Sequence, residues 1–459
     1  MSAGIVWFRR DLRLADHPAL HRALQECEAL ACIYIDAPGD DGRDASRAWL
    51  RHSLDALGEA IAARGGALHV LRGDPAAWLP RLAEALGARA VYASRLHEAD
   101  ADAGDERIAA ALRRDGRAFI RLGGRLLTDA DAVMTRSGTP FRVFTPFLRA
   151  ARPTWRPRPL LPAPARIPGA SMPVLPGLHS RRIAAPRPAW DAEFWAEWTP
   201  GEHGATTRLA GFLPKLSRYA EGRDLPAHDL TSRLSPHLHF GEIGPGAILS
   251  AIAASPGEGA EKFIAELGWR EFAYYVLAHW PHAAQENFDP RFDGMAWTRD
   301  EVAFDAWRMG RTGVPLVDAG MRQLWRTGWM HNRVRMIAAS YLVKHVGVDW
   351  RRGADWFLHT LVDADLANNA LGWQWVAGSG VDAAPYYRIF NPVLQSRKFD
   401  PEGDYIRRWV PELAALSTRE IHAPWEFGRK VEGYPARPVV GLGEGRARAL
   451  AAFAALKSG

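Results

Sequence analysis

The first 124 residues alternate between two periodicities, and this alternation constrains the fold more than any other feature of the chain. Five short apolar or β-branched runs, each suited to one buried strand, are separated by segments with helical spacing. This pattern predicts a doubly wound α/β domain with a five-stranded parallel sheet, which binds ligands beyond the carboxyl ends of its strands. The runs are GIVWFRR (4–10), LACIYID (30–36), ALHVLRG (67–73), RAVYAS (89–94) and AFIRLGG (118–124), and the helical segments are 17–27, 45–64, 76–86 and 102–115.

A proline-rich segment separates this region from the remainder of the chain. Proline is so frequent between 151 and 190 that amide donors are missing and helix is blocked, which predicts an extended connector. After 191 the spacing is helical almost to the end, and one helix start is indicated by Ser235, a capping residue before Pro236. We therefore predict an α/β domain at 1–130, a connector at 131–198 and an all-α domain at 199–459.

Composition narrows the class of protein. The 459 residues include no run approaching the roughly 18 apolar residues of a membrane span, and the N-terminus lacks the pattern of a signal peptide. Only two cysteines are present, too few for a disulfide framework or a cysteine-based zinc site. A net charge of +6 suits a polyanionic partner. We expect a cytoplasmic protein with no membrane segment and no metal.

Tryptophan is unusually abundant. The chain has 19 tryptophans, and twelve of them lie between 269 and 425. Large cores absorb some tryptophan, but each buried indole N–H needs a hydrogen-bond partner. The cluster favours stacking surfaces, a bound aromatic cofactor or electron transfer.

Polar residues interrupt several of the predicted helices. The segment TSRLS (231–235), preceded by Tyr219 and Arg223, is either an ordinary capped helix or an anion site. In FIAELGWREF, Glu266, Trp269 and Arg270 share one helical face, either as a salt bridge beside a core tryptophan or as part of a site.

Two further segments place polar groups in apolar surroundings. Asn332 and Met336 stand four residues apart on one predicted helical face. Asp363 and Asp365 lie inside LVDADLANNALGWQW, where buried acids require a cation or donors, and Arg335 is a plausible partner.

Seven short motifs, in order over nearly the whole chain, resemble those of the photolyase and cryptochrome family. The resemblance implies an α/β antenna-binding domain followed by a helical domain with one FAD per chain, active in its reduced anionic form. Within the family, the chain looks closest to the class I cyclobutane pyrimidine dimer photolyases. The motifs are WFRRDLRLADHPAL, TSRLS, WREF, TGWMHNRVRM, DADLANN, WQW and DAAPYYRIFNP.

The resemblance also implies which residues bind the cofactor. Asn369 takes the place that faces flavin N5, where repair enzymes have Asn and plant-type light sensors have an acid. The other matching residues are Tyr219, Thr231, Ser232, Arg233, Leu234, Ser235, Phe263, Arg335, Asp363 and Asp365.

The implied reaction is light-driven repair of cyclobutane pyrimidine dimers, by electron transfer from excited reduced FAD to a flipped-out dimer. Repair of the (6-4) photoproduct is disfavoured, because enzymes of that subgroup have His where Asn332 and Met336 stand. A cryptochrome-type photoreceptor and a DNA-binding flavoprotein without catalysis remain alternatives. The implied catalytic residues are Glu266, Trp269, Asn332, Met336, Asn369 and Trp375.

The remaining implied roles concern electrons, DNA and light. Trp297, Trp350 and Trp373 match the family's electron-transfer chain, with core packing as the alternative reading. We expect a monomer that binds UV-damaged DNA, and a second antenna chromophore of unknown identity. Arg9, Arg10 and Asp11, after the first strand, either line that chromophore or form ion pairs of the loop. The implied DNA-binding residues are Arg223, Trp269, Arg333, Arg388, Arg397 and Lys398.

Overall fold

A computed structural model describes residues 2–37, 44–97, 99–155, 158–178, 182–183, 189–384 and 386–456. The chain forms two compact units. The first comprises Met1–Phe141, Thr145–Ser217 and Ser232–Pro281, and the second comprises Arg142–Phe144, Arg218–Thr231 and His282–Gly459. The first unit therefore also contains part of the segment that the sequence assigns to the helical domain, and the predicted domain boundaries stay a prediction.

A five-stranded parallel sheet forms the centre of the first unit, and this confirms the predicted fold class. The strand order β3-β2-β1-β4-β5 reverses direction between β1 and β4, so the topological switch point lies at the carboxyl ends of these two strands. Every predicted strand is present, within two residues of its expected bounds. The strands are β1 (Ala3–Phe8), β2 (Ala29–Asp36), β3 (Leu68–Arg72), β4 (Ala88–Ser94) and β5 (Ala118–Leu122).

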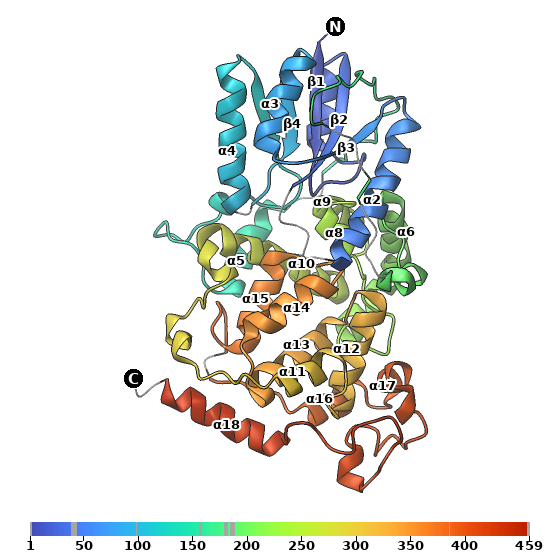
Figure 1. Cartoon of the computed structure of the whole chain (residues 1–459), viewed down its shortest axis with the longest axis vertical. Coiled ribbons are helices and arrows are strands. Elements are labelled where there is room, and N and C mark those ends of the chain that lie inside the picture. Colours follow the sequence, from blue (N-terminus) through green and yellow to red (C-terminus); the bar gives the residue numbers. More distant parts are fainter. Residues whose placement is uncertain are drawn as a thin grey trace. The chain divides into compact units, whose positions relative to one another are not determined.

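Helices cover both faces of this sheet (Figure 1). α3 and α4 pack together on one face, where Leu79 and Leu112 join Ile5, Ile33 and Val91 in a buried apolar cluster. The first two crossovers run one way along the sheet and the next two run the other way, so right-handed connections place α1 and α2 on the opposite face from α3 and α4. The helices are α1 (Pro18–Glu26), α2 (Asp44–Ala62), α3 (Pro75–Ala85) and α4 (Ala99–Arg114).

The connector is less uniform than its composition predicts. It contains the helix α5 (Phe144–Ala151), and Leu30 of β2 forms an isolated bridge with Gly169. The helix predicted to follow a Ser235 cap instead includes Ser235 as its first residue, with Leu234 as the cap. The remaining helices of this unit are α6 (Glu202–Phe212), α8 (Ser235–Phe240), α9 (Pro245–Ile252) and α10 (Glu258–His279).

The second unit is helical throughout its described part, as the sequence predicts (Figure 1). Its core is one apolar cluster to which Trp307, Trp350, Phe357 and Trp373 contribute large buried rings. A π-helical turn at Tyr341–Val346 follows α13 directly. The helices are α7 (Tyr219–Gly222), α11 (Glu301–Arg308), α12 (Pro315–Thr327), α13 (Asn332–Ser340), α14 (Trp350–Thr360), α15 (Leu366–Ala377), α16 (Pro392–Phe399), α17 (Asp404–Trp409) and α18 (Leu442–Ala455).

Candidate functional site

The switch point of the sheet holds an internal ion pair. Arg9, one residue after β1, pairs with Asp105 of α4 at 2.7 Å, and both side chains are almost fully buried. The same guanidinium donates to the backbone carbonyl of Ser94, the last residue of β4. The two strand ends at which such sheets bind ligands are thus bridged by side chains of the protein itself.

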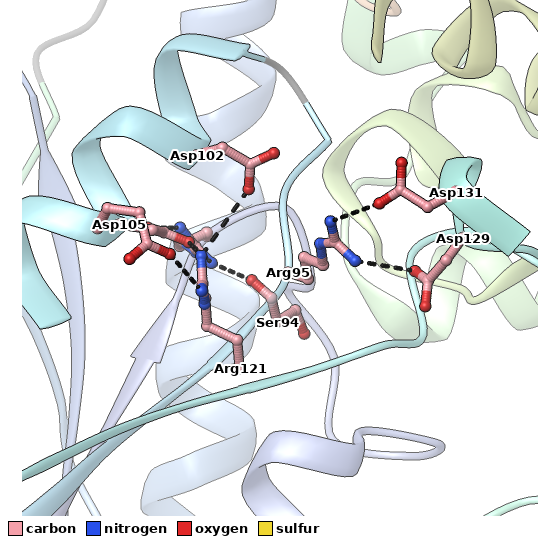
Figure 2. Close-up of polar contacts among 9 residues, drawn as sticks. Ser94, Arg95, Asp102, Asp105, Arg121, Asp129 and Asp131 are labelled. Atoms are coloured by element: carbon pink, nitrogen blue, oxygen red, sulfur yellow. Dashed lines mark hydrogen bonds and ion pairs between the residues drawn. The ribbon is translucent and has the colours of Figure 1, made fainter. Parts of the chain in front are cut away.

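Further ion pairs surround this bridge (Figure 2). Arg121 of β5 contacts Asp105 and Asp102, and Arg95 lies between Asp129 and Asp131 at 3.7–3.8 Å. In the adjacent loop, Asp11 pairs with His17 at 3.1 Å, and Arg10 lies 2.7 Å from His239. Of the two interpretations of Arg9, Arg10 and Asp11, the structure supports polar contacts within the protein.

The TSRLS segment is divided between the units. Thr231 belongs to the second unit, together with Tyr219 and Arg223, whose guanidinium lies over the Tyr219 ring. In the first unit, the guanidinium of Arg233 donates to Glu197 at 2.9 Å, so its charge is already balanced. Ser232 Oγ accepts from the backbone N–H of Leu234. Ser235 is exposed at the start of α8.

α10 carries the other predicted residues of the first unit. Phe263 is buried against Phe212, whereas Glu266 and Trp269 are half-buried and stand at i and i+3 on this helix. Trp269 packs edge-on against Phe272, with ring centroids 6.0 Å apart.

Glu271, on the same helix, is a buried acid that the sequence did not single out. Its carboxylate accepts hydrogen bonds from the backbone N–H groups of Leu127 and Thr128 and from Arg270. Burial raises the pKa of Glu271 to about 7, against the lowering effects of Arg270 and of these hydrogen bonds. The signal in the sequence was an acid inside the apolar run that follows WR.

In the second unit, the predicted partnership of Arg335 and Asp363 is present. Arg335 of α13 donates to Oδ2 of Asp363 at 2.9 Å and to the carbonyl of Met330 at 2.7 Å. The other carboxylate oxygen, Oδ1, is buried and has no hydrogen-bond partner within the described part of the chain. A buried acceptor of this kind requires a donor, so the pair is suited to a ligand that carries an N–H group.

α15 orients two more predicted residues. Asp365 is its N-cap and accepts from the backbone N–H and the side-chain amide of Asn368, so it has a structural role at this helix start. Asn369 is half-buried, and its Nδ2 donates to the carbonyl of Ala354 on α14 at 3.0 Å. This bond fixes the amide so that its oxygen points away from α14.

The three tryptophans of the predicted electron-transfer chain belong to one apolar cluster. Trp350 and Trp373 are buried within it, and the half-buried Trp297 packs against it. The ring of Trp373 packs directly against Gly353 of α14. A Cβ atom at Gly353 would stand only 2.2 Å from Cη2 of Trp373. Gly353 follows Trp350 by three residues, which places both on the same side of α14.

The predicted lesion-binding residues of the second unit differ in exposure. Trp375 and Met336 are half-buried at the margin of the same apolar cluster, whereas Asn332 is exposed at the first position of α13. The guanidinium of Arg388 lies 5.9 Å from the centre of the Trp375 ring. As expected for residues two apart on a helix, Trp373 and Trp375 face different neighbours.

The predicted DNA-binding cations are not equivalent. Arg333 pairs with Asp224 at 2.6 Å, and Arg223 contacts the same carboxylate at 3.7 Å. Arg397 pairs with Glu426 at 3.1 Å. Arg388 and Lys398 are exposed and lie over aromatic rings. Among these cations, Arg388 and Lys398 therefore carry the positive charge that carboxylates neutralise least.

The second unit contains hydrogen-bonding and charged groups of the kind that bind a flat aromatic cofactor with polar edges. The open oxygen of Asp363 can accept from an N–H group of the cofactor, and Arg335 supplies positive charge for an anionic ring. Asn369 adds a fixed amide, and buried indoles lie nearby in the same core. These features define a class: a flavin-type redox protein in which tryptophans line the cofactor-binding unit.

Comparison with known proteins identifies the family. Residues 4–166 match the family model described as DNA photolyase, and residues 263–455 match that of the FAD binding domain of DNA photolyase. A deoxyribodipyrimidine photo-lyase from Agrobacterium fabrum is 43% identical, over 99% of this chain and 98% of that protein. The chain therefore belongs to the DNA photolyase family.

Two solved structures extend the comparison. A bacterial class III photolyase from Agrobacterium tumefaciens has a TM-score of 0.95 and 42% identity, covering 100% of this chain and 98% of that one. An archaeal photolyase from Sulfolobus tokodaii with two FAD molecules has a TM-score of 0.83 and 30% identity, covering 99% and 100%. The predicted assignment to class I is not supported, because the protein similar at 0.95 belongs to class III.

Among the described residues, no helix combines the length and hydropathy needed to cross a bilayer. Within the same residues, His, Cys, Asp and Glu side chains form no group of three that could hold a metal ion.

Proposed function

We propose that this protein is a deoxyribodipyrimidine photo-lyase, which uses light to split cyclobutane pyrimidine dimers in DNA. The observation that carries the proposal is the 43% identity, along nearly the whole of both chains, with a relative of that name. The geometry of the second unit supports it, because the unit has an open acceptor for a flavin and half-buried groups for an apolar substrate. Within the family, we propose a class III enzyme.

FAD would be held in the second unit by the Arg335–Asp363 pair. Oδ1 of Asp363 would accept a hydrogen bond from the ring N–H, and Arg335 would balance negative charge on the reduced ring. Asn369 would offer its amide oxygen to the same ring, since its nitrogen is already bound to Ala354. When bound, reduced FAD supplies a light-excited electron donor and takes the electron back after the dimer is split.

The substrate must leave the double helix before it can react. Flipping a damaged base step out costs a few kcal/mol, less than for an intact step, and photolyases are a standard example of enzymes that flip bases. Trp375 would stack on the dimer, and such a contact contributes about 1–3 kcal/mol per base. Met336 would fill apolar space beside it, and Asn332 would supply a hydrogen bond. On α10, Trp269 is proposed for a second stacking contact and Glu266 for a hydrogen bond to a dimer carbonyl.

Recognition of DNA outside the dimer is proposed to depend on phosphate contacts. Arg388 and Lys398 are the strongest candidates, because they are exposed, whereas Arg333 and Arg397 already neutralise carboxylates. Binding that neutralises phosphates weakens with added salt. Trp297, Trp350 and Trp373 are proposed to resupply electrons to FAD. A second chromophore is proposed without an identity.

The proposal is tested by loading the full-length protein with FAD, reducing it, and illuminating it with a dimer-containing oligonucleotide. We expect restoration of the two pyrimidines in light and none in the dark. Glu266→Gln and Trp375→Ala should lower the yield of repair with FAD retained. Light-independent repair, or bound flavin with no repair of any dimer, would contradict the proposal and favour a non-catalytic role.

A further inference from the structure

The buried indole of Trp350, which lies on the proposed electron path, donates its hydrogen bond to a side-chain amide. Its side chain is buried at the first position of α14, and its Nε1–H donates to Oδ1 of Asn287 at 2.9 Å. Asn287 is buried as well. On the ring face, Arg351 stacks at 4.9 Å from the ring centre and is itself held by Asp349 and by the carbonyl of Gln285. The indole is therefore fixed at both its edge and its face.

The orientation of the Asn287 amide is determined by a third residue. Its Nδ2 donates to Oδ1 of Asp293 at 2.7 Å, and a carboxylate can only accept, so the amide oxygen must face the indole. The loop that carries Asn287 is held by Gln374, whose Nε2 donates to the carbonyls of Ala283 and Glu286. Gln374 lies between Trp373 and Trp375 on α15, so the loop is anchored to the helix that carries both.

An indole that has lost an electron becomes a much stronger acid at its N–H. A carboxylate or imidazole acceptor would take that proton and leave a neutral radical, whereas an amide oxygen is too weak a base to do so. The protein does place a carboxylate on a buried indole elsewhere: Trp49, in the first unit, donates to Glu242 at 2.9 Å. The carboxylate at Trp49 and the amide at Trp350 are thus alternative acceptors within the same chain, and the proposed electron path contains the one that leaves the proton on the indole.

We propose that Asn287 is a positioning residue that keeps oxidised Trp350 protonated, so that Trp350 relays electrons and does not trap the oxidised state. This inference rests on the proposed function, in which Trp373, Trp350 and Trp297 resupply electrons to FAD. Trp350 gives one electron to oxidised Trp373 and keeps its N–H bond. It then takes one electron from Trp297, which an external thiol reductant restores. No proton leaves the buried indole of Trp350. The half-buried Trp297 is the residue of the path that can lose a proton to solvent.

The test uses the full-length FAD-loaded protein in a Trp297→Phe background, in which Trp350 becomes the last tryptophan of the path. Transient absorption distinguishes the cationic from the neutral tryptophan radical by their different visible spectra. The decisive variant exchanges the two side chains, Asn287→Asp with Asp293→Asn, which preserves the hydrogen bond between them but turns a carboxylate towards the indole. Asp293→Asn alone is the matched control, because the indole N–H of Trp350 still requires the amide oxygen of Asn287, whose Nδ2 can donate to the new amide oxygen at position 293. Asn287→Asp alone serves as a second variant.

We expect the cationic radical in the background protein and in the control, and a shift to the neutral radical in the exchanged variant. Its formation should be slower in deuterated water, which a purely structural effect would not produce. Neutral radical already present in the background protein, or cationic radical in both variants that carry Asn287→Asp, would overturn the role of Asn287. Absence of any tryptophan radical would overturn the electron path itself. Dimer repair by chemically reduced enzyme reports separately on the proposed function, and the exchange should leave it unchanged.

Discussion

The charged groups at the carboxyl edge of the sheet differ in their pairing from the Arg335–Asp363 pair of the helical unit. At the sheet edge, Arg9 is matched by Asp105, and Arg121 and Arg95 each contact at least two acids of the same unit (Figure 2). In the helical unit, the Arg335–Asp363 pair leaves one buried carboxylate oxygen without a donor among the described residues. An unsatisfied buried acceptor costs about 1–3 kcal/mol, and a bound ligand can remove this cost.

The difference shows that the position of a polar group in a fold does not by itself identify a ligand site. A doubly wound sheet binds ligands at its switch point in many proteins, yet here the charged residues Arg9 and Asp105 at that point are paired with each other. The open oxygen of Asp363 is the more informative feature, because Oδ2 of Asp11 at the sheet edge also lacks a hydrogen bond but lies 3.1 Å from the ring nitrogen of His17. The following changes test whether the two regions differ in this way.

The largest effect is expected at the sheet edge. Arg9→Ala would remove the near partner of the buried Asp105 carboxylate and leave only Arg121, at 3.8 Å. Breaking a buried pair costs about 3–5 kcal/mol of the free energy of unfolding, and we expect a loss towards the lower end of that range. Chemical denaturation measures the loss. Arg95→Ala is the matched control, because its pairs are partly exposed and contribute about 0–1 kcal/mol. Equal losses in the two variants would show that the edge is not a closed, buried network.

At the open pair, the expected effect is on the cofactor. Asp363→Asn keeps the shape of the side chain but removes the charge, and hydrogen bonds to charged groups contribute about 1.5–3 kcal/mol. We therefore expect FAD affinity to fall by roughly 10- to 100-fold, measured by flavin fluorescence during titration. Asp349→Asn serves as the control, since its carboxylate caps α14 and asparagine caps equally well. Unchanged affinity in Asp363→Asn would remove this residue from the flavin site.

A packing change tests the contact between α14 and α15. Gly353→Ala would place a methyl group 2.2 Å from the Trp373 ring, and overpacking of this kind costs about 1–3 kcal/mol. Light-driven reduction of FAD by thiol should slow, because Trp373 must shift. Gly372→Ala, on α15, has no atom within 4 Å of the new methyl group and should be neutral or stabilising. Normal reduction in Gly353→Ala would argue against a role for Trp373.

The remaining prediction concerns the pH dependence of stability at Glu271 in the first unit. Its pKa is raised to about 7 by burial, so the folded state binds the proton more tightly than the unfolded chain does. The free energy of unfolding should therefore fall as pH rises from about 4.5 to about 7, by at most about 1.4 kcal/mol per pH unit from this group. Glu271→Gln should flatten that part of the profile, measured by denaturation at several pH values. A profile identical to that of the parent would contradict the raised pKa.

Much of the fold could be predicted because its signals are local. Strand and helix periodicities gave all five strands and the four helices between them, since each segment carries its own burial pattern. The start of α8 was misplaced by one residue because Ser235 has the chemistry of a cap but lies inside the helix. α5 was missed because the whole of 131–198 was assigned to the connector, although the proline-rich part begins only where this helix ends.

The site was predictable only in part, because its partnerships are long-range. The Arg335–Asp363 pair followed from the rule that buried acids need cations, although 28 residues separate the two. That Asp224 neutralises Arg333, or that Glu271 accepts hydrogen bonds from Leu127 and Thr128, could not be inferred, because nothing in the local sequence links these residues. Asn287 had no local signal of any kind and became visible only beside Trp350.

The central claim is that the helical unit holds a flavin whose light-excited electron splits a pyrimidine dimer. The most direct measurement is the absorbance spectrum of the purified protein, followed by illumination of the reduced protein with a dimer-containing oligonucleotide. We predict a flavin spectrum at one FAD per chain and light-dependent conversion of the dimer to two pyrimidines. A protein that binds no flavin when supplied with FAD, or one that binds it and leaves the dimer intact in light, would contradict the account.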